Sequence, residues 1–329
     1  MIRWKSLWPG ALAMDSNPHE IRQLGGVIPP MITPFSDDDS IDSSLLRTET
    51  QFLLEAGVNG IVVGGSTGEG AGMSAEELCE ATSVVVETVN GSIPVLSGVI
   101  ADTSDEAVRL GKAALRAGAA ALQVPPPHFN VGISSALLSR YYRAITDGTG
   151  LPLIIYNVIP WAQVAVESLE HLAAGNPMIV GVKQSGRNIH LLAALLAFLK
   201  GRIPIYSAID DLVYPSFMLG ADGTISGTSS VFPRETVELW ECVREGNVAR
   251  ALELHNALVP VWRSLDGPQF PSRVKYALAL LGRAAGKPRS PFTWPRGKDA
   301  ARIEQALETG GFLAAGPRAT VSGTIIERT

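Results

Sequence analysis

The chain has 329 residues, of which 46% are hydrophobic and 18% are charged. This composition provides enough apolar side chain for a large core and excludes a disordered chain. The 27 Lys and Arg residues stand against 32 Asp and Glu residues, a formal charge of −5 with no run of like charge, which argues against a nucleic-acid partner.

Cysteine and histidine usage limits the kind of site. The two cysteines, Cys79 and Cys242, lie far apart in helix-like stretches, and the five histidines show no metal-ligand spacing with them. We therefore expect a reducing compartment, the cytoplasm, and no metal site. No uninterrupted apolar run approaches ~18 residues, so we expect no contact with a membrane.

The N-terminus has a weak targeting signal. Arg3 and Lys5 precede an apolar stretch over residues 7–14 that is short for a signal peptide and is interrupted by Pro and Gly. Met14 is an equally good start, which leaves open whether residues 1–13 belong to the natural protein. We expect a flexible, non-targeting leader over residues 1–25.

From residue 26 onward, short apolar or β-branched runs alternate with longer helical patterns. The expected strands are Val27–Thr33, Gly60–Val63, Val95–Ile100, Ala120–Val124, Leu153–Asn157, Ile179–Gln184, Ile203–Ile209 and Gly223–Gly227. The expected helices are Ser43–Ala56, Ser74–Val89, Ser104–Ala117, Ser134–Thr146, Glu167–Ala173, Ile189–Leu199, Leu212–Leu219 and Pro233–Arg244. Many of the helices begin at a capping residue, as in Ser74 with Glu77 three residues later.

Eight strand–helix units with nearly continuous apolar strands predict an α/β fold, a (β/α)8 TIM barrel over residues 26–246. A doubly wound sheet would alternate in the same way, but no Gly-x-Gly-x-x-Gly follows the first strand. Helical patterns without strands then predict a C-terminal helical region over 247–310, followed by a poorly ordered or loosely packed tail over 311–329. The helices expected there are Asn247–Leu265, Ser272–Ala285 and Lys298–Glu308.

Lys183 is the strongest candidate for chemistry. It follows the apolar run of residues 178–182, and alternation in a barrel strand points it inward, at the end of the barrel where such folds carry their active sites. A lysine that extends out of the barrel or pairs with a buried acid is the structural alternative. Apolar surroundings would lower the pKa of the amine, so that its unprotonated form could attack a ketone and form a Schiff base.

Tyr156 ends the preceding strand in the equivalent position. A core tyrosine with one backbone partner is the usual role for such a residue. Next to a Schiff-base lysine, however, a phenol can transfer the protons that formation and dehydration of the carbinolamine require. We therefore expect Tyr156 to be the acid/base group.

A glycine-rich turn, Gly-Gly-Ser-Thr-Gly-Glu-Gly, occupies residues 64–70 after the second strand. Such a turn can present backbone N–H groups to an anion, and Ser66 and Thr67 add hydroxyl donors. The turn lacks the Gly-Lys-Ser/Thr ending of a phosphate loop, so we expect its ligand to be a small carboxylate rather than a phosphate.

Taken in order, these elements resemble the dihydrodipicolinate synthase and N-acetylneuraminate lyase family of class I aldolases. The resemblance covers about residues 26–285 and includes Pro-Met-Ile-Thr-Pro-Phe at 30–35, the Gly-Ser-Thr-Gly-Glu loop, Tyr156-Asn157, Gly-Val-Lys at 181–183 and Gly-Ala-Asp-Gly-Thr-Ile-Ser at 220–226.

The resemblance implies a homotetramer, built as a dimer of dimers and without a cofactor, that acts on small 2-oxo acids and aldehydes. It implies a Schiff base between Lys183 and pyruvate or a related 2-oxo acid, with Ser66 relaying protons to Tyr156. The residues that it assigns to substrate binding are Thr67, Gly65, Gly68 and, through its main-chain carbonyl, Ile225.

Departures from the family pattern concern the second substrate. In the synthases of this family an arginine shortly after the Tyr-Asn pair binds aspartate semialdehyde, but residues 158–163 contain none. We therefore expect poor condensation with that aldehyde. Those synthases also use a second tyrosine, in a loop where this chain has His128 and Phe129. Phe129 cannot carry a proton, and His128 is either its replacement or a surface residue.

Three further residues are candidates for contacting the second substrate. Ser185, two places after the lysine, matches a Ser or Thr of the lyase and 4-hydroxy-2-oxoglutarate aldolase branches. Asp210 and Asp211 match a region that contacts substrate hydroxyls in the sugar-acid lyases. A helix N-cap followed by an acid favoured by the helix dipole explains the two aspartates equally well.

The leading hypothesis is a Schiff-base lyase that cleaves or forms a carbon–carbon bond, like N-acetylneuraminate lyase or 4-hydroxy-2-oxoglutarate aldolase. The first alternative keeps Lys183 but makes the enzyme a 4-hydroxy-tetrahydrodipicolinate synthase or a sugar-acid dehydratase. A barrel that only binds a 2-oxo acid is the non-enzyme alternative, which an inward lysine does not favour.

Overall fold

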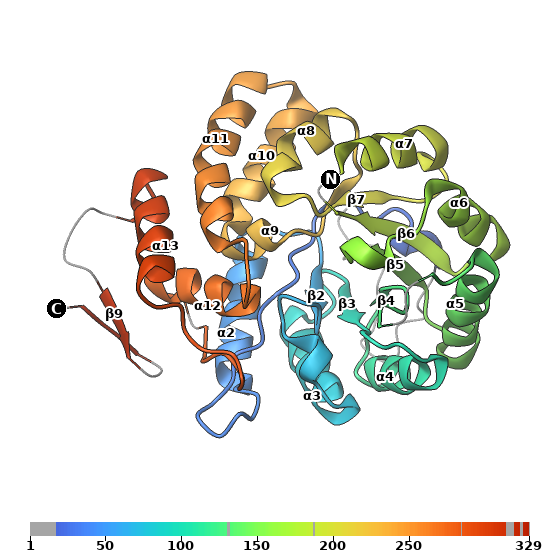
Figure 1. The fold of residues 1–329 in the computed structure, drawn as a ribbon, viewed down its shortest axis with the longest axis horizontal. Helices are drawn as coiled ribbons and strands as arrows, with labels where there is room; N and C mark the ends of the chain where they lie inside the picture. The colour runs from blue at the N-terminus through green and yellow to red at the C-terminus, as the bar shows by residue number, and fades with distance from the viewer. Residues whose placement is uncertain are drawn as a thin grey trace.

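The computed structural model describes residues 18–129, 132–186, 188–283 and 285–313, and the backbone of 319–322 and 325–328. Figure 1 shows strands surrounded by helices, with further helices on one side. The strands run in the order β1-β8-β7-β6-β5-β4-β3-β2, and every neighbouring pair is parallel. The predicted (β/α)8 barrel is confirmed.

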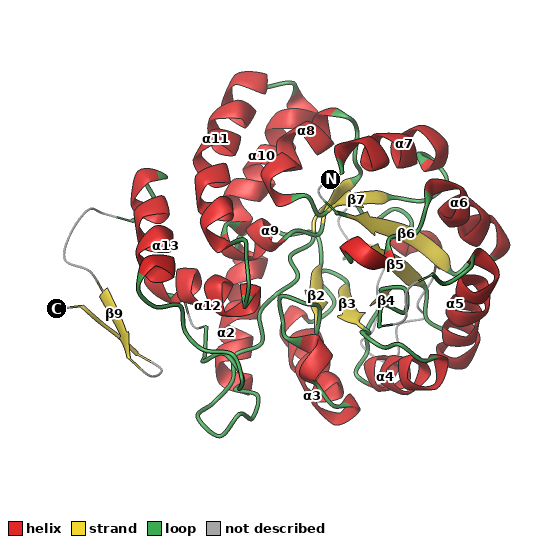
Figure 2. Cartoon of the chain, in the orientation of Figure 1, coloured by secondary structure: helices red, strands yellow, loops and turns green. Residues whose placement is uncertain are grey.

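The strands are short and form the inner layer, while the helices lie outside them (Figure 2). The strands are β1 Gly26–Val27, β2 Ile61–Val63, β3 Val95–Gly98, β4 Ala121–Val124, β5 Leu153–Asn157, β6 Ile179–Gln184, β7 Ile205–Ser207 and β8 Gly223–Thr224. The helices up to the end of the barrel are α1 Pro18–Ile21, α2 Ser43–Glu55, α3 Ala75–Val89, α4 Ser104–Arg116, α5 Ser135–Thr149, α6 Val166–Gly175, α7 Ile189–Leu199, α8 Val213–Met218, α9 Gly227–Val231 and α10 Pro233–Glu245.

Local sequence signals explain where several helices begin and end. At the start of α3 the Ser74 hydroxyl accepts the Glu77 N–H, and the Glu77 carboxylate accepts the Ser74 N–H, which is the predicted capping box. The stretches that follow α2 and α4 contain Gly57 and Gly118 with φ of 80° and 86°, a conformation that glycine adopts without strain.

The first strand is shorter than predicted. We expected Val27–Thr33, but β1 ends at Val27, because Pro29 and Pro30 have no N–H to extend the ladder. The backbone still closes the barrel here, since the Val62 N–H donates to the Pro29 carbonyl and Pro30 forms a parallel bridge with Val62.

The eighth unit also differs. We expected a strand over Gly223–Gly227, but β8 ends at Thr224 and the short helix α9 begins at Gly227. A Cβ at Gly227 would lie 2.6 Å from the Phe270 ring, so the close packing of this turn against the C-terminal region requires glycine.

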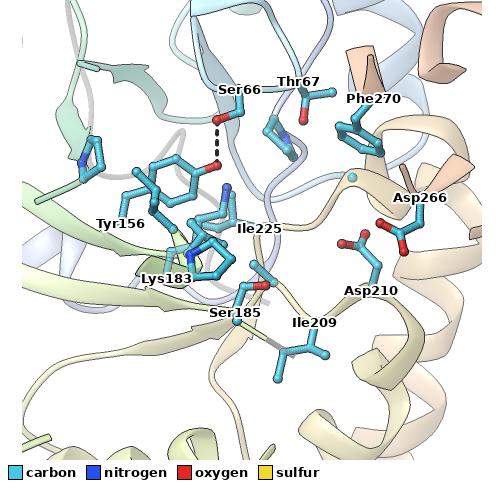
Figure 3. A pocket seen from close by; sticks show the side chains of 18 of the residues that line it. Ser66, Thr67, Tyr156, Lys183, Ser185, Ile209, Asp210, Ile225, Asp266 and Phe270 are labelled. Atoms are coloured by element: carbon cyan, nitrogen blue, oxygen red, sulfur yellow. Dashed lines mark hydrogen bonds between the residues drawn. The ribbon is translucent and has the colours of Figure 1, made fainter. Parts of the chain in front are cut away.

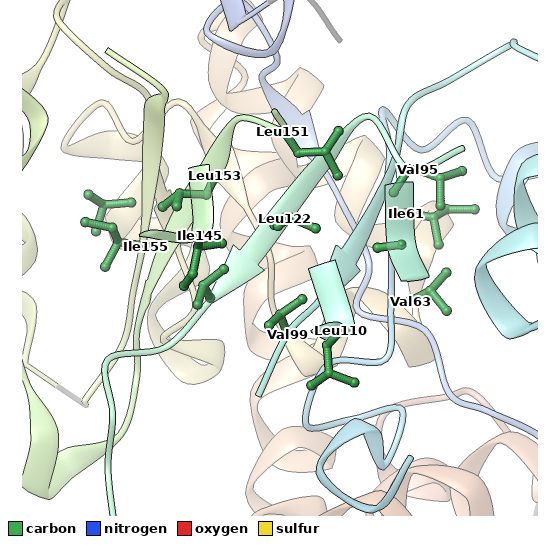
Figure 4. Packing of buried hydrophobic residues seen from close by; sticks show 14 of the residues in the cluster. Ile61, Val63, Val95, Val99, Leu110, Leu122, Ile145, Leu151, Leu153 and Ile155 are labelled. Carbon is green, nitrogen blue, oxygen red and sulfur yellow. The ribbon is translucent and has the colours of Figure 1, made fainter. Parts of the chain in front are cut away.

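Two apolar layers hold the barrel together. The inner layer includes Ile154, Val180 and Tyr206, and Leu24 packs against these side chains. The Tyr206 hydroxyl donates a hydrogen bond to the Leu24 carbonyl. The outer layer packs between strands and helices, as Figure 4 shows for side chains such as Leu122.

Helix α1 and the buried Ile21 lie within the segment that we expected to be a flexible leader. That segment is therefore packed against the barrel from residue 18 onward.

The C-terminal helical region packs as a separate apolar cluster beside the barrel. Its helices are α11 Val248–Leu265, α12 Phe270–Leu280 and α13 Lys298–Thr309. We expected the middle helix to cover Ser272–Ala285, but it begins two residues earlier and ends at Leu280, before Gly282 with φ of 75°.

Two strands that were not predicted, β9 Ala319–Ser322 and β10 Ile325–Arg328, pair as an antiparallel hairpin within the tail. In the part of the chain that the structure describes, none of the helices is both long and apolar enough to cross a bilayer.

Candidate active site

A pocket of about 860 Å³ opens at the carboxyl ends of the barrel strands. Figure 3 shows side chains from several loops pointing into it. The predicted site residues that line it are Ser66, Thr67, Tyr156, Lys183, Ser185, Asp210 and Ile225, joined by His128 and Asp211. Gly65 and Gly68 belong to the adjacent turn but are not among the lining residues.

Lys183 lies at the centre of this pocket, on β6. It is 4% exposed, and its Nζ lies 4.0 Å from the centroid of the Tyr156 ring. Burial lowers the pKa of Lys183 to about 7, against the opposing effect of the negative charge of Asp210. A substantial fraction of this amine is therefore unprotonated at neutral pH.

Tyr156 lies beside the lysine because β5 and β6 pair in register, with Tyr156 opposite Lys183. The Tyr156 hydroxyl lies 3.0 Å from the Ser66 hydroxyl, a hydrogen bond drawn in Figure 3. Burial raises the pKa of Tyr156, although the Ser66 hydrogen bond opposes this shift. The phenol is therefore protonated at neutral pH and linked to a second hydroxyl through which a proton can pass.

The glycine-rich turn after β2 places Ser66 and Thr67 at the rim of the same pocket. The turn closes on itself, since the N–H groups of Gly68 and Gly70 both donate to the Gly65 carbonyl at 3.0 Å. The Gly68 N–H is therefore committed to the turn, and the Gly68 carbonyl accepts the Thr33 hydroxyl at 2.9 Å. Thr67 is 5% exposed and contributes a hydroxyl at the pocket wall.

Asp210 follows β7 and lines the pocket. Its carboxylate does not cap the helix that follows it in the chain, because the N-cap residues of the short 3-10 helix Asp210–Leu212 and of α8 are Ile209 and Leu212. The Asp210 carboxylate instead accepts the N–H and the hydroxyl of Thr228 at 2.6 and 2.9 Å, at the start of α9. Burial raises the pKa of Asp210 to about 7 despite these hydrogen bonds.

His128 and Trp161 form one side of the pocket entrance. The His128 N–H donates to the Asp102 carboxylate at 2.5 Å, and its ring Nδ1 lies 3.4 Å from the same oxygen. The Trp161 indole donates to the His128 carbonyl at 3.1 Å, and the residue is 65% exposed. Phe129, which we expected to have no catalytic part, is 84% exposed and does not line the pocket.

The C-terminal helical region supplies lining residues that the sequence analysis missed. They are Trp262, Arg263, Asp266, Phe270 and Arg302. The Arg302 guanidinium donates to the Arg263 carbonyl, which ties α13 to α11 at the pocket edge. These residues lie 79 to 119 positions after Lys183 and carry no motif, so only the packing of α11 and α13 beside the barrel brings them here. Within the described residues, no group of three or more His, Cys, Asp or Glu side chains is arranged to hold a metal ion.

A (β/α)8 barrel with a buried lysine and a tyrosine facing it at the carboxyl ends of neighbouring strands defines an aldolase-type lyase. The chain matches the model of the dihydrodipicolinate synthetase family over residues 23–309, and it belongs to that family. Members of the family are lyases, and so is this protein.

The curated relatives match over nearly their whole length. The chain is 34% identical over 297 residues to the 4-hydroxy-tetrahydrodipicolinate synthase of Methanopyrus kandleri, covering 89% of this chain and 99% of the relative. It is 32% identical over 285 residues to the enzyme of the same name from Archaeoglobus fulgidus, covering 86% and 97%.

Solved structures agree on the fold. Dihydrodipicolinate synthase from Aquifex aeolicus superimposes with a TM-score of 0.82 at 29% identity, covering 88% of this chain and 98% of that one. A prophage protein of E. coli K12 from the same family, solved in complex with pyruvate, gives a TM-score of 0.83 at 28% identity, covering 88% and 99%.

Proposed function

We propose that this protein is a Schiff-base aldolase that joins pyruvate or a related 2-oxo acid to an aldehyde, or cleaves the corresponding product. The observation that carries the proposal is the buried Lys183 amine in the pocket, with its pKa lowered to about 7. The pyruvate complexes solved for relatives support the choice of substrate.

The chemistry balances without a cofactor. The unprotonated Nζ of Lys183 attacks the keto carbon, the ketone oxygen takes up protons, and water leaves to give an iminium. Loss of a proton from the neighbouring carbon gives an enamine, which attacks the aldehyde carbon to form the new carbon–carbon bond. Hydrolysis of the iminium releases the product and restores the amine; cleavage runs through the same steps in reverse.

Tyr156 and Ser66 are proposed to move the protons in these steps. Formation of the carbinolamine and loss of water need a group that both donates and accepts a proton near the keto carbon. The Tyr156 ring lies against the amine, and its hydroxyl is hydrogen-bonded to Ser66. Thr67 and the turn that presents it are proposed to receive the carboxylate of the 2-oxo acid, and the main-chain carbonyl of Ile225, another lining residue, is proposed as a further contact.

For the second substrate, we now propose the synthase reaction, condensation with aspartate semialdehyde, as the first candidate. The names of the relatives favour it over the lyase that we expected from the sequence. Arg263 and Arg302 at the pocket edge also supply positive charge for a second carboxylate, although no arginine follows Tyr156-Asn157. A coupled assay of pyruvate with aspartate semialdehyde tests this, and a kcat/KM far below about 10⁴ M⁻¹s⁻¹ would contradict it.

A sugar-acid or 4-hydroxy-2-oxo acid lyase is the second candidate. The partly buried Asp210 and the Ser185 hydroxyl line the pocket where the hydroxyl groups of such a substrate would lie. A panel of 2-oxo sugar acids, assayed by pyruvate release, distinguishes this candidate from the synthase.

We propose a homotetramer in the cytoplasm. Exposed apolar side chains on the outer helices, such as Phe198 at 59% and Met218 at 51%, are suited to a subunit contact. Both cysteines are free, as expected in a reducing compartment. Light scattering coupled to gel filtration should give a mass about four times that of the chain, and a monomer would contradict the proposal.

A further inference from the structure

Glu69, in the glycine-rich turn, has a strained backbone. Its φ of 59° and ψ of 26° lie in the left-handed region, which a glutamate rarely adopts. Its side chain is 3% exposed, so its carboxylate is also removed from water. A glycine would adopt this conformation without strain, so the carboxylate must make contacts that offset both costs.

Those contacts come from the C-terminal helical region. One carboxylate oxygen lies 2.6 Å from the Nζ of Lys275 on α12, whose side chain is fully buried. The other carboxylate oxygen accepts the backbone N–H of Arg289 at 3.1 Å. Lys275 also donates to the Lys287 carbonyl at 2.8 Å and lies 4.5 Å over the Phe35 ring. A buried charge is retained only where it is paired and hydrogen-bonded, so this arrangement has little freedom to move.

The same glutamate is part of the turn that forms the pocket wall. The Glu69 N–H donates to the Ser66 carbonyl at 3.2 Å, and the Ser66 hydroxyl bonds to Tyr156. Neither Glu69 nor Lys275 is among the residues that line the pocket. A displacement of Glu69 would therefore act on the site through the neighbouring residues that line it, Ser66, Thr67 and Ala71.

We propose that the ion pair between Glu69 and Lys275 is a positioning device for 2-oxo acid binding, through which α12 holds the turn that presents Ser66 and Thr67 to the substrate carboxylate. The inference rests on the proposed function, because it takes this turn as the carboxylate site. Glu69 and Lys275 are positioning residues, and neither touches the substrate.

The chain offers a matched control pair. Glu49 on α2 forms an ion pair with Arg283, which follows α12, and the two side chains are 2% and 7% exposed. This pair also joins the C-terminal region to the barrel through a buried carboxylate, but Glu49 belongs to no segment that contributes to the pocket. Glu49→Gln therefore reproduces the loss of a buried charge without touching the turn.

The experiment measures how much pyruvate is needed to trap the protein as its borohydride-reduced adduct, by intact mass, for wild type, Glu69→Gln and Glu49→Gln. We expect Glu69→Gln to raise the half-saturating pyruvate concentration by about tenfold or more, because small displacements of binding groups have large effects. The adduct at saturating pyruvate should still be complete, since Lys183 is unchanged. Glu49→Gln should lower the melting temperature but leave half-saturation within about twofold of wild type.

If Glu69→Gln gives no soluble protein, Glu69→Gly with Lys275→Met removes both charges and relieves the strained backbone. The same rise in half-saturation is expected of that double variant. An unchanged half-saturation in either variant, or failure of both to fold, would overturn the inference, because the pair would then serve stability alone. Absence of any adduct in wild type would instead overturn the proposed function.

Discussion

Lys183 and Tyr156 are paired across β6 and β5, and the lysine Nζ lies 4.0 Å from the centroid of the tyrosine ring. An ammonium over an aromatic face is attracted to it, which would favour the charged lysine. Burial has the opposite and larger effect, and it lowers the pKa of Lys183 to about 7. The pair therefore combines a nucleophile that is available at neutral pH with a protonated phenol beside it.

The first prediction is a pH profile. Only the free amine attacks the ketone, so the rate of adduct formation with pyruvate should rise with pH and level off above about pH 7, the pKa of Lys183. The Asp210 carboxylate favours the ammonium form, so Asp210→Asn should move the midpoint to lower pH. Borohydride trapping after fixed reaction times, at a series of pH values, measures the midpoint for wild type and for Asp210→Asn. A midpoint near the pKa of an ordinary lysine, about 10.4, would contradict the account.

The second prediction concerns the Tyr156 hydroxyl. Tyr156→Phe keeps the ring and removes the hydroxyl, so kcat should fall by roughly 10²–10⁴ while the melting temperature changes little. Tyr141→Phe is the control, because the Tyr141 hydroxyl donates to the Ala101 carbonyl at 2.9 Å and lies outside the pocket. It should reduce stability by about 1 kcal/mol and leave kcat unchanged. A loss below about tenfold in Tyr156→Phe would make Tyr156 a packing residue.

The third prediction tests the shape of the glycine-rich turn. A Cβ at Gly70 would lie 1.7 Å from the Gly64 carbonyl oxygen, so Gly70→Ala must open the turn. We expect a large rise in KM for pyruvate together with lower stability. Gly72→Ala, two residues further on, has no atom within 4 Å of the new Cβ and should behave as wild type. Equal kinetics for the two variants would show that the turn does not bind the 2-oxo acid.

The fourth prediction concerns the arginines of the C-terminal region. If Arg302 interacts with a carboxylate of the second substrate, Arg302→Ala should raise KM for aspartate semialdehyde by about 10- to 100-fold, the effect of losing a charge-assisted hydrogen bond. Half-saturation by pyruvate in the trapping assay should not change. If Arg302→Ala has wild-type kinetics toward the aldehyde, Arg302 does not contact the second substrate. Another cationic residue would then have to bind its carboxylate.

The sequence predicted the barrel because each strand–helix unit repeats the same apolar periodicity, and Lys183 stood out because a charged residue ends an apolar strand. It did not predict where β1 and β8 end, since these boundaries depend on Pro29, Pro30 and the packing of Gly227 against Phe270. Glu69 was seen as part of a motif, but its partner Lys275 lies 206 residues away and has no sequence signal. Arg263 and Arg302 were missed for the same reason, because only the packing of helices beside the barrel brings them to the pocket.

Treatment of the protein with pyruvate and sodium borohydride, followed by peptide mass spectrometry to locate the adduct, tests most directly whether Lys183 is the nucleophile. Lys275 is a demanding internal comparison, because burial lowers its pKa to about 8 and it is the other lysine with a strongly shifted pKa among the described residues. We expect one adduct, with the mass of pyruvate less water plus two hydrogens, on Lys183, and none in Lys183→Ala. An adduct on Lys275, an adduct that persists in Lys183→Ala, or no adduct in wild type would contradict it.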